Sequence, residues 1–270
     1  MKSLKQFLVY SNLLVAFCVL ALALSSEILL GSSNYRISQF VFFATLFTYN
    51  FQRLVQVKSG KQHVRKDWLE KHKFVISVLT FISGIISAYH FFSFQGNTQI
   101  AIVFSGILSI LYPFGLREIP FSKIFIIALV WAISTQLLLI LENNLILNQQ
   151  VLLHLAARFL FVFAITIPFD IRDMKYDIKK LRTIPLQFGV SKAKLMAIFS
   201  LFICVIIAIF QQFQNSLNLA NLLALILLYF LASILIAKSN TNRNEMYFSF
   251  WIESLSILYY LFLAISILMF

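Results

Sequence analysis

The sequence predicts an all-α protein, a polytopic bundle of about nine helices that crosses a membrane. Three observations carry this prediction. The 270-residue chain is 60% hydrophobic and 12% charged, whereas soluble domains carry about 25% charged residues. Its apolar residues gather in runs of about 20, the length of helix that spans the hydrocarbon core of a bilayer. Its Lys and Arg residues lie mostly between these runs, on one side of the predicted membrane.

Nine apolar runs qualify as spans, although the fourth and fifth are short. No linker, low-complexity tract or soluble segment separates them, so we expect one membrane domain covering residues 1–270. Span boundaries predicted in this way are uncertain by about 2–4 residues. The predicted spans are 7–30, 37–57, 74–95, 98–113, 124–141, 151–169, 195–213, 217–237 and 247–270.

The distribution of positive charge predicts the orientation. With the N-terminus in the cytoplasm, every Lys and Arg between spans faces the cytoplasm except Arg36, while Arg53 and Arg158 fall within spans. Basic residues favour the cytoplasmic side of a membrane protein. The longest charged loops, 58–73 and 170–194, lie on that side. We therefore expect an integral membrane protein with a cytoplasmic N-terminus and a cytoplasmic active face. The sequence shows no targeting motif, which fits a bacterial plasma membrane.

Several other functional classes are disfavoured. The net charge of +12 is explained by basic residues at the membrane boundary, so we expect no nucleic-acid partner. Cys18 and Cys204 lie in apolar runs without a CxxC pair or a Cys/His cluster, which argues against a disulfide framework and a zinc site. All four prolines lie at or beyond the ends of spans, whereas transporters often have helices broken near the midplane.

One acidic cluster directly follows the sixth predicted span. Asp170, Asp173 and Asp177 are spaced by three and four residues, which places them on one face if the segment is helical. Carboxylates of this kind suit Mg²⁺, which usually combines one or two of them with substrate phosphates. Arg172 and Lys179 in the same loop could bind phosphate oxygens. A solvated surface helix with internal ion pairs is the open alternative.

The segment from Asp170 to Gly189 resembles the second aspartate-rich motif of the UbiA-type intramembrane prenyltransferases. The shared pattern is D-x-x-D-x-x-x-D, followed by Pro185 and Gly189. Leu181 stands where the family has Gly, and Ile184 replaces the usual Leu. Specific similarity is limited to about twenty residues, but the nine-span layout also matches over most of the chain.

A second similarity lies between the fourth and fifth spans. Residues 111–117, followed by Lys123 and Trp131, are similar to the loop that the family has there. By this resemblance, Lys123 and Arg117 would stand at the mouth of a central cavity and bind a diphosphate.

The resemblance implies transfer of a polyprenyl group from its diphosphate to an aromatic or other small acceptor within the membrane. In the family, two aspartate-rich motifs hold Mg²⁺ ions that bridge the diphosphate, and an acceptor attacks the allylic carbocation left behind. Asp170, Asp173 and Asp177 are therefore the expected catalytic and Mg²⁺-binding residues. The expected partners are a polyprenyl diphosphate, a small acceptor and the lipid bilayer.

The family's first aspartate-rich motif is degenerate in this chain. At the end of the second predicted span only Asn50 matches the motif. The three aspartate positions hold Phe51, Leu54 and Lys58. The first metal site of the family is therefore not expected to form.

Two functional interpretations follow, and a structural one stands beside them. In the first, Arg53 and Lys58 replace the metal and bind the diphosphate, with hydrogen bonds from Asn50 and Gln52. In the second, the chain is a catalytically inactive lipid- or partner-binding protein on the same scaffold. In the third, Arg53 only extends to the membrane surface. A shared cavity for Arg53 and the Asp170 segment would favour the first.

Three other polar residues fall within predicted spans: His154, Arg158 and Glu253. Buried charges in membranes are usually paired. We expect these residues to pair with one another across the bundle, or Glu253 to pair with Arg53.

Overall fold

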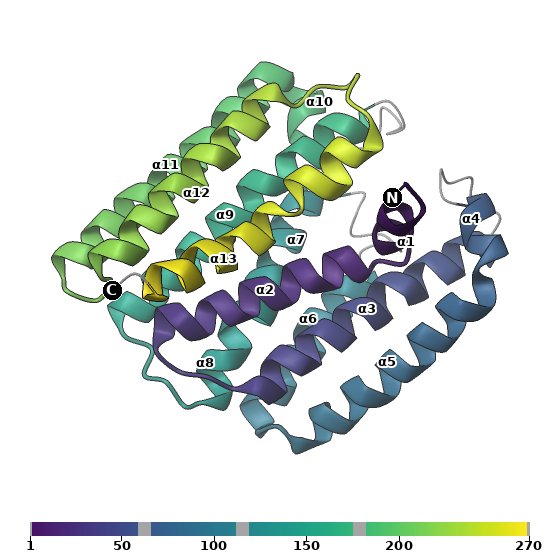
Figure 1. The fold of residues 1–270 in the computed structure, drawn as a ribbon, viewed down its shortest axis with the longest axis horizontal. Coiled ribbons are helices and arrows are strands. Elements are labelled where there is room, and N and C mark those ends of the chain that lie inside the picture. The colour runs from purple at the N-terminus through teal and green to yellow at the C-terminus, as the bar shows by residue number, and fades with distance from the viewer. Residues whose placement is uncertain (1, 59–65, 112–118, 175–181, 269–270) are drawn as a thin grey trace.

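The computed structural model describes residues 2–58, 66–111, 119–174 and 182–268, and all regular elements in these ranges are helical (Figure 1). The predicted all-α class is therefore confirmed. Two segments, η3 and η4, are π-helical and continue into α-helices. The elements are α1 (Lys2–Tyr10), α2 (Leu13–Leu30), α3 (Tyr35–Lys58), α4 (Lys66–Lys71), α5 (Lys73–Ser93), α6 (Gly96–Leu111), α7 (Ser122–Ala132), η3 (Ile133–Leu137), α8 (Leu138–Glu142), α9 (Gln149–Asp173), α10 (Ile184–Phe188), α11 (Val190–Phe213), α12 (Leu219–Lys238), η4 (Tyr247–Ile252) and α13 (Leu255–Leu268).

Seven helical segments of the described chain are long and apolar enough to cross a membrane. The α6 helix is apolar but shorter, and α3 is long but less apolar. The count of nine spans and the cytoplasmic N-terminus stay predictions. The seven segments are Leu13–Leu30, Lys73–Ser93, Ser122–Glu142, Gln149–Asp173, Val190–Phe213, Leu219–Lys238 and Tyr247–Leu268.

The predicted first span, 7–30, is interrupted near its start. Helix α1 ends at Tyr10, and Asn12 adopts a left-handed conformation with φ 59° before α2 begins. Asn is one of the few residues that tolerate this conformation. The amide of Asn12 donates a hydrogen bond to Asn50 Oδ1 at 2.8 Å, and Asn50 Nδ2 donates to Ser11 O at 3.1 Å. The break therefore depends on α3, which a hydropathy pattern does not report.

The helices run side by side across the molecule (Figure 1). The α2 helix packs between α3 and α13, and it also contacts η3. The α9 helix packs between α7 and α11, while α12 joins α11 to α13. The α5 helix lies against α3. This arrangement places the last turns of α3 and α9 at the same end of the bundle. We call this end, where Arg53 and Asp173 lie, the charged end.

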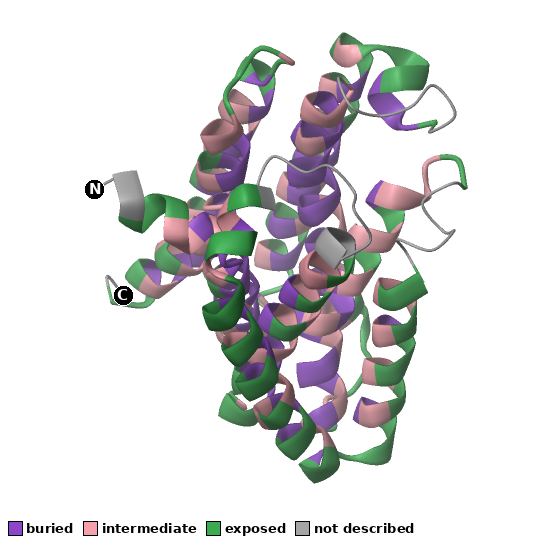
Figure 2. Cartoon of the chain, turned by 90° about the vertical axis from the view of Figure 1, so that its right-hand side faces the viewer, coloured by how far each residue is buried: buried purple, intermediate pink, exposed green. Residues whose placement is uncertain are grey.

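Helix α5 is polar inside and apolar outside, the reverse of a soluble helix. Phe74, Phe81 and Phe92 are each 70% or more exposed. Figure 2 shows exposed positions along the outer faces of the helices. An apolar exterior suits contact with lipid rather than water. The buried stripe of α5 is Ile76, Thr80, Ser83, Ser87 and His90.

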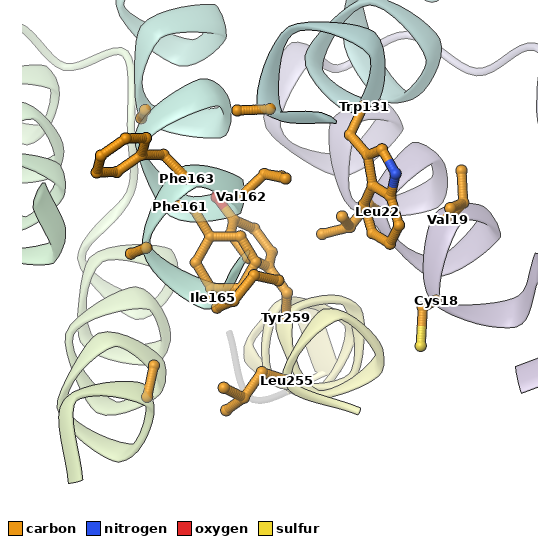
Figure 3. Close-up of a cluster of buried hydrophobic side chains, with 14 of the residues drawn as sticks. Cys18, Val19, Leu22, Trp131, Phe161, Val162, Phe163, Ile165, Leu255 and Tyr259 are labelled. Carbon is orange, nitrogen blue, oxygen red and sulfur yellow. The ribbon is translucent and has the colours of Figure 1, made fainter. Parts of the chain in front are cut away.

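The apolar core lies where α2, α7, α9 and α13 meet (Figure 3). Leu22 and Trp131 belong to this core, and Phe161 of α9 packs edge-on against Tyr259 of α13 with ring centroids 5.0 Å apart. Aromatic pairs of this geometry add to the stabilisation from buried area. The core thus fixes α9 against its neighbours and positions the last turn of α9.

Arg158 is buried beside this core, but not in the expected pairing with Glu253. It is 1% exposed and donates hydrogen bonds to Ser25 Oγ at 2.7 Å and Ser26 Oγ at 3.1 Å. Its guanidinium carbon lies 4.5 Å from the ring centroid of Tyr259. Hydroxyl groups and a ring, rather than a carboxylate, therefore contact this cation in the part of the chain described.

Candidate functional site

A cavity of about 320 Å³ opens at the charged end, between α1, α2, α3, α7, α9 and η4. Its volume falls in the range of small-molecule sites, about 300–1,000 Å³. One part of its wall is charged or polar. The charged wall, with adjoining polar residues, includes Gln52, Arg53, Lys123, Arg172, Asp173, Ser249 and Glu253; Asn12, Thr48, Tyr49, Ser109 and Thr166 are further polar residues of the lining.

The rest of the cavity wall is mainly apolar and comes from α2, α7 and α9. Such a surface suits a hydrocarbon chain, because burying apolar groups together is favourable. Trp131 and Phe169 add aromatic faces to it. The remaining apolar wall includes Val15, Ile127, Val130, Val162 and Ile165.

The last turn of α9 carries two of the three predicted aspartates. Helix α9 continues to Asp173, beyond the predicted end of the span, so Asp170 and Asp173 lie one turn apart on one helical face. Both carboxylates contact the same cation, since Lys123 Nζ lies 2.7 Å from Asp170 Oδ1 and 2.8 Å from Asp173 Oδ2. Asp170 is almost fully buried, whereas Asp173 reaches the cavity.

Arg172 is held against the wall by several contacts. Its Nε donates to Asp173 Oδ1 at 2.9 Å, and its Nη1 donates to Ser249 Oγ at 3.5 Å. Its guanidinium carbon lies 5.2 Å from the ring centroid of Phe169 and 5.8 Å from that of Phe248. Cation–π contacts and a carboxylate therefore orient this arginine at the cavity.

The end of α3 contributes Arg53 and Gln52 to the same cavity. Gln52 Nε2 donates to Ser109 O at 2.9 Å, which ties α3 to α6. Arg53 and Asp173 thus line one space, the arrangement that favours joint phosphate binding by the two segments. Glu253, the expected alternative partner of Arg53, lines this space too.

Asn50 does not line the cavity. Its side chain is fully buried, and both its amide oxygen and its amide nitrogen are bonded at the α1–α2 break. The arrangement gives Asn50 a structural role and does not favour its predicted role as a diphosphate ligand.

Four predicted residues cannot be placed in the site. Asp177, Lys179 and Arg117 lie outside the described residues, and the side chain of Lys58 is outside them as well. Their proposed roles in binding metal or diphosphate stay predictions.

The carboxylates of Asp170 and Asp173 fit one divalent metal, provided that Lys123 moves away from them. No described group of three His, Cys, Asp or Glu side chains could hold a metal ion. However, Asp170 and Asp173 direct one oxygen each at the point where Lys123 Nζ lies. Two carboxylates with phosphate oxygens suffice for Mg²⁺, so the metal fits if the ammonium moves aside. Phe51 and Leu54 offer no oxygen for a second metal of the family type.

Two features of the site were not predicted from the sequence. Ser249 enters the wall from the π-helical segment η4, where a pattern based on 3.6 residues per turn misplaces side chains. The double ion pair of Lys123 joins residues from distant segments, although the resemblance to the family's loop between the fourth and fifth spans had marked Lys123 as a candidate.

We compared the sequence and the fold with those of known proteins. The model of the UbiA prenyltransferase family matches residues 63–255. A UbiA homolog from Archaeoglobus fulgidus bound to GPP and Mg²⁺ has a similar structure, with a TM-score of 0.65 and 16% identity over 97% of this chain and 99% of that chain. The structure of the UbiA homolog from Archaeoglobus fulgidus bound to DMAPP and Mg²⁺ has a TM-score of 0.64 and 15% identity, over 98% of this chain and 100% of that chain. A structure of digeranylgeranylglyceryl phosphate synthase has a TM-score of 0.61 and 15% identity, over 100% of both chains. No curated protein matches the sequence.

Proposed function

Because the chain belongs to the UbiA prenyltransferase family, we propose that it binds a polyprenyl diphosphate and transfers the prenyl group to a small acceptor within the membrane. The observation that carries this proposal is the shared cavity of Arg53 from α3 and Asp173 from α9. The similar structures that hold GPP or DMAPP with Mg²⁺ support the same class of ligand here.

The cations at the charged end would hold the diphosphate. Arg53 and Arg172 both line the cavity, and a guanidinium can bind two phosphate oxygens at once. Lys123 lines the same wall. Lys58 follows Arg53 after little more than one helical turn and would add positive charge at the mouth, as would Lys179 and Arg117 from the adjoining loops.

The aspartates would hold a metal ion beside the diphosphate. Asp170 and Asp173, together with Asp177, would bind Mg²⁺, which would supply positive charge to the departing diphosphate. Arg53 and Arg172 would stabilise the same developing negative charge from the other side. A fixed set of charges in a site of low water content is effective because it needs no reorganisation during the reaction.

The apolar wall would hold the prenyl chain and protect the allylic cation. The bond between the first prenyl carbon and the diphosphate oxygen breaks, and the diphosphate leaves with the electron pair. The acceptor then bonds to that carbon and loses a proton. Trp131 and Phe169 line the cavity, and their ring faces would stabilise the allylic cation. Exclusion of water by Val162 and Ile165 would protect that cation from hydrolysis.

Ligand binding followed by a turnover screen tests the proposal. Detergent-purified protein is titrated with geranyl and geranylgeranyl diphosphates, with and without Mg²⁺, and then incubated with aromatic acceptors. We expect Mg²⁺-dependent binding that Asp173→Ala weakens at least tenfold, whereas the exposed-surface variant Lys192→Ala leaves it unchanged. Protein shown to be folded that binds neither diphosphate at any Mg²⁺ concentration contradicts the proposal.

The degenerate first motif favours a second candidate, a non-catalytic lipid- or partner-binding protein. Phe51 and Leu54 replace two metal-binding positions of the family. The screen separates the two candidates, because the second predicts diphosphate or lipid binding without release of diphosphate for any acceptor.

The proposed location is a bacterial plasma membrane, with the charged end in the cytoplasm. The concentration of Lys and Arg in loops at that end supports this orientation. Water-soluble parts of the substrate and the metal would then reach the cavity from the cytoplasm.

A further inference from the structure

Lys123 contacts both described aspartates of the acidic cluster. Its ammonium nitrogen lies 2.7 Å from Asp170 Oδ1 and 2.8 Å from Asp173 Oδ2. The Lys123 side chain is 11% exposed, and those of the two aspartates are 1% and 21% exposed. Ion pairs so little exposed to water are screened less than surface pairs. A cation of the chain itself is therefore bound where the two carboxylates converge.

The backbone before Lys123 is tied to the segment that follows the aspartate-rich motif. Phe121, which has φ 63° and precedes α7, donates its backbone N–H to Arg182 O at 2.9 Å. The rings of Phe121 and Phe188 stack with centroids 5.8 Å apart. These contacts hold the first turn of α7 beside the end of α9. The lysine is thus positioned by the fold and is not a surface chain that happens to reach the aspartates.

The described charges around the cavity balance one another. The cations Arg53, Lys123 and Arg172 face the carboxylates Asp170, Asp173 and Glu253. A diphosphate carries several negative charges. In this arrangement the described side chains offer it no excess of positive charge, since Lys123 and Arg172 are already paired with carboxylates.

We propose that Lys123 is a built-in cation that competes with a divalent metal for Asp170 and Asp173 and is released to the diphosphate when metal and substrate bind together. This inference rests on the proposed function. With Asp170 and Asp173 holding a metal, Lys123, which already lines the cavity, would become available to phosphate oxygens.

The consequence is a positive coupling between metal and substrate. Metal alone binds weakly because it must displace a paired ammonium of low exposure. Diphosphate alone binds weakly because that ammonium is engaged by carboxylates. Each ligand removes the obstacle to the other, and by linkage the factor by which one raises the affinity of the other is the same in both directions.

Removing the lysine should therefore create a better metal site. In Lys123→Met the two carboxylates lose their shared cation, and like charges so close together repel one another. We expect the affinity for Mn²⁺, measured without diphosphate, to rise at least tenfold. Lys123→Arg keeps the positive charge and should bind the metal as weakly as the wild type does.

The test is a metal titration of full-length protein in detergent, followed by electron paramagnetic resonance of free Mn²⁺. The exposed Lys192→Met is the matched control and should behave as the wild type. The double variant Lys123→Met/Asp173→Asn should lose the gain, which would place the metal at the aspartates. An unchanged or lower Mn²⁺ affinity of folded Lys123→Met overturns the proposal.

Thermal unfolding covers the case in which Lys123→Met is too unstable to titrate. Loss of the cation that Asp170 and Asp173 share should lower the Tm, and millimolar Mg²⁺ should restore the Tm in this variant but leave that of Lys192→Met unchanged. A loss of stability that Mg²⁺ does not restore would also overturn the proposal.

The metal titration is repeated in the presence of geranyl diphosphate. The diphosphate should raise the metal affinity strongly in the wild type and less in Lys123→Met. Failure of every protein to bind the diphosphate would refute the proposed function, while the metal titration without diphosphate would still decide the role of Lys123.

Discussion

Arg53 and Asp173 line the same cavity, one from the end of α3 and the other from the end of α9. They bring a cation and a carboxylate to one space at the charged end of the bundle. The proposed diphosphate site rests on this relationship between the degenerate first motif and the second motif.

The first prediction concerns Arg53, which we propose takes the place of the family's first metal site. Arg53→Ala should lower the affinity for geranylgeranyl diphosphate at least tenfold, because a hydrogen bond to a charged group contributes about 1.5–3 kcal/mol. Arg53→Lys should retain part of the affinity, since it keeps the charge but loses bidentate binding.

Arg36→Ala is the matched control, because Arg36 lies on the same helix at its other end, where it is 4.0 Å from Glu142. Equal losses of affinity in Arg36→Ala and Arg53→Ala would argue against a specific role for Arg53. Equilibrium binding to detergent-purified protein measures all three variants.

The second prediction separates structure from binding at Asn50. Asn50→Ala removes two buried hydrogen bonds at the α1–α2 break and leaves the amide of Asn12 without its partner. Loss of a buried partner costs about 1–3 kcal/mol, so the Tm should fall. The diphosphate affinity of the folded variant should stay within about twofold of the wild type. A normal Tm together with a large loss of affinity would instead identify Asn50 as a diphosphate ligand.

The third prediction concerns topology. Asn215 and Asn240 are exposed at opposite ends of α12, and Asn240 lies at the charged end. In intact cells, a membrane-impermeant maleimide should label Asn215→Cys and label Asn240→Cys only after the membrane is opened. The native Cys18 and Cys204 are buried, which keeps the background low. The reverse labelling pattern would contradict the predicted cytoplasmic orientation.

The fourth prediction concerns Arg158. Its Nε and Nη1 atoms are buried without a hydrogen-bond partner, and burying a charge that no opposite charge compensates costs free energy. Arg158→Met should therefore keep or raise the Tm and leave diphosphate affinity unchanged. A lower Tm with lost affinity would show that this cation supports the site.

The helical class and the seven long apolar helices of the described chain could be predicted because a bilayer imposes length and apolarity on each helix. The break at Asn12 could not, because it lies in an otherwise apolar run and depends on Asn50 from another helix. The likeness of the Asp170 segment to a known motif pointed to the site itself. The pairing of Lys123 with both Asp170 and Asp173 required the packing of α7 against α9. Ser249 required the register of a π-helical segment, which period-based reading misses.

The central claim, that this cavity holds a polyprenyl diphosphate, is tested most directly by photolabelling. A prenyl diphosphate with a photoreactive group on its chain is irradiated with the purified protein, and the labelled residues are identified by mass spectrometry. The account predicts labels on the apolar wall, at Trp131, Val162 and Ile165, that excess geranylgeranyl diphosphate removes. Labels confined to the outward face of α5, at Phe81 and Phe92, that geranylgeranyl diphosphate does not remove would contradict it.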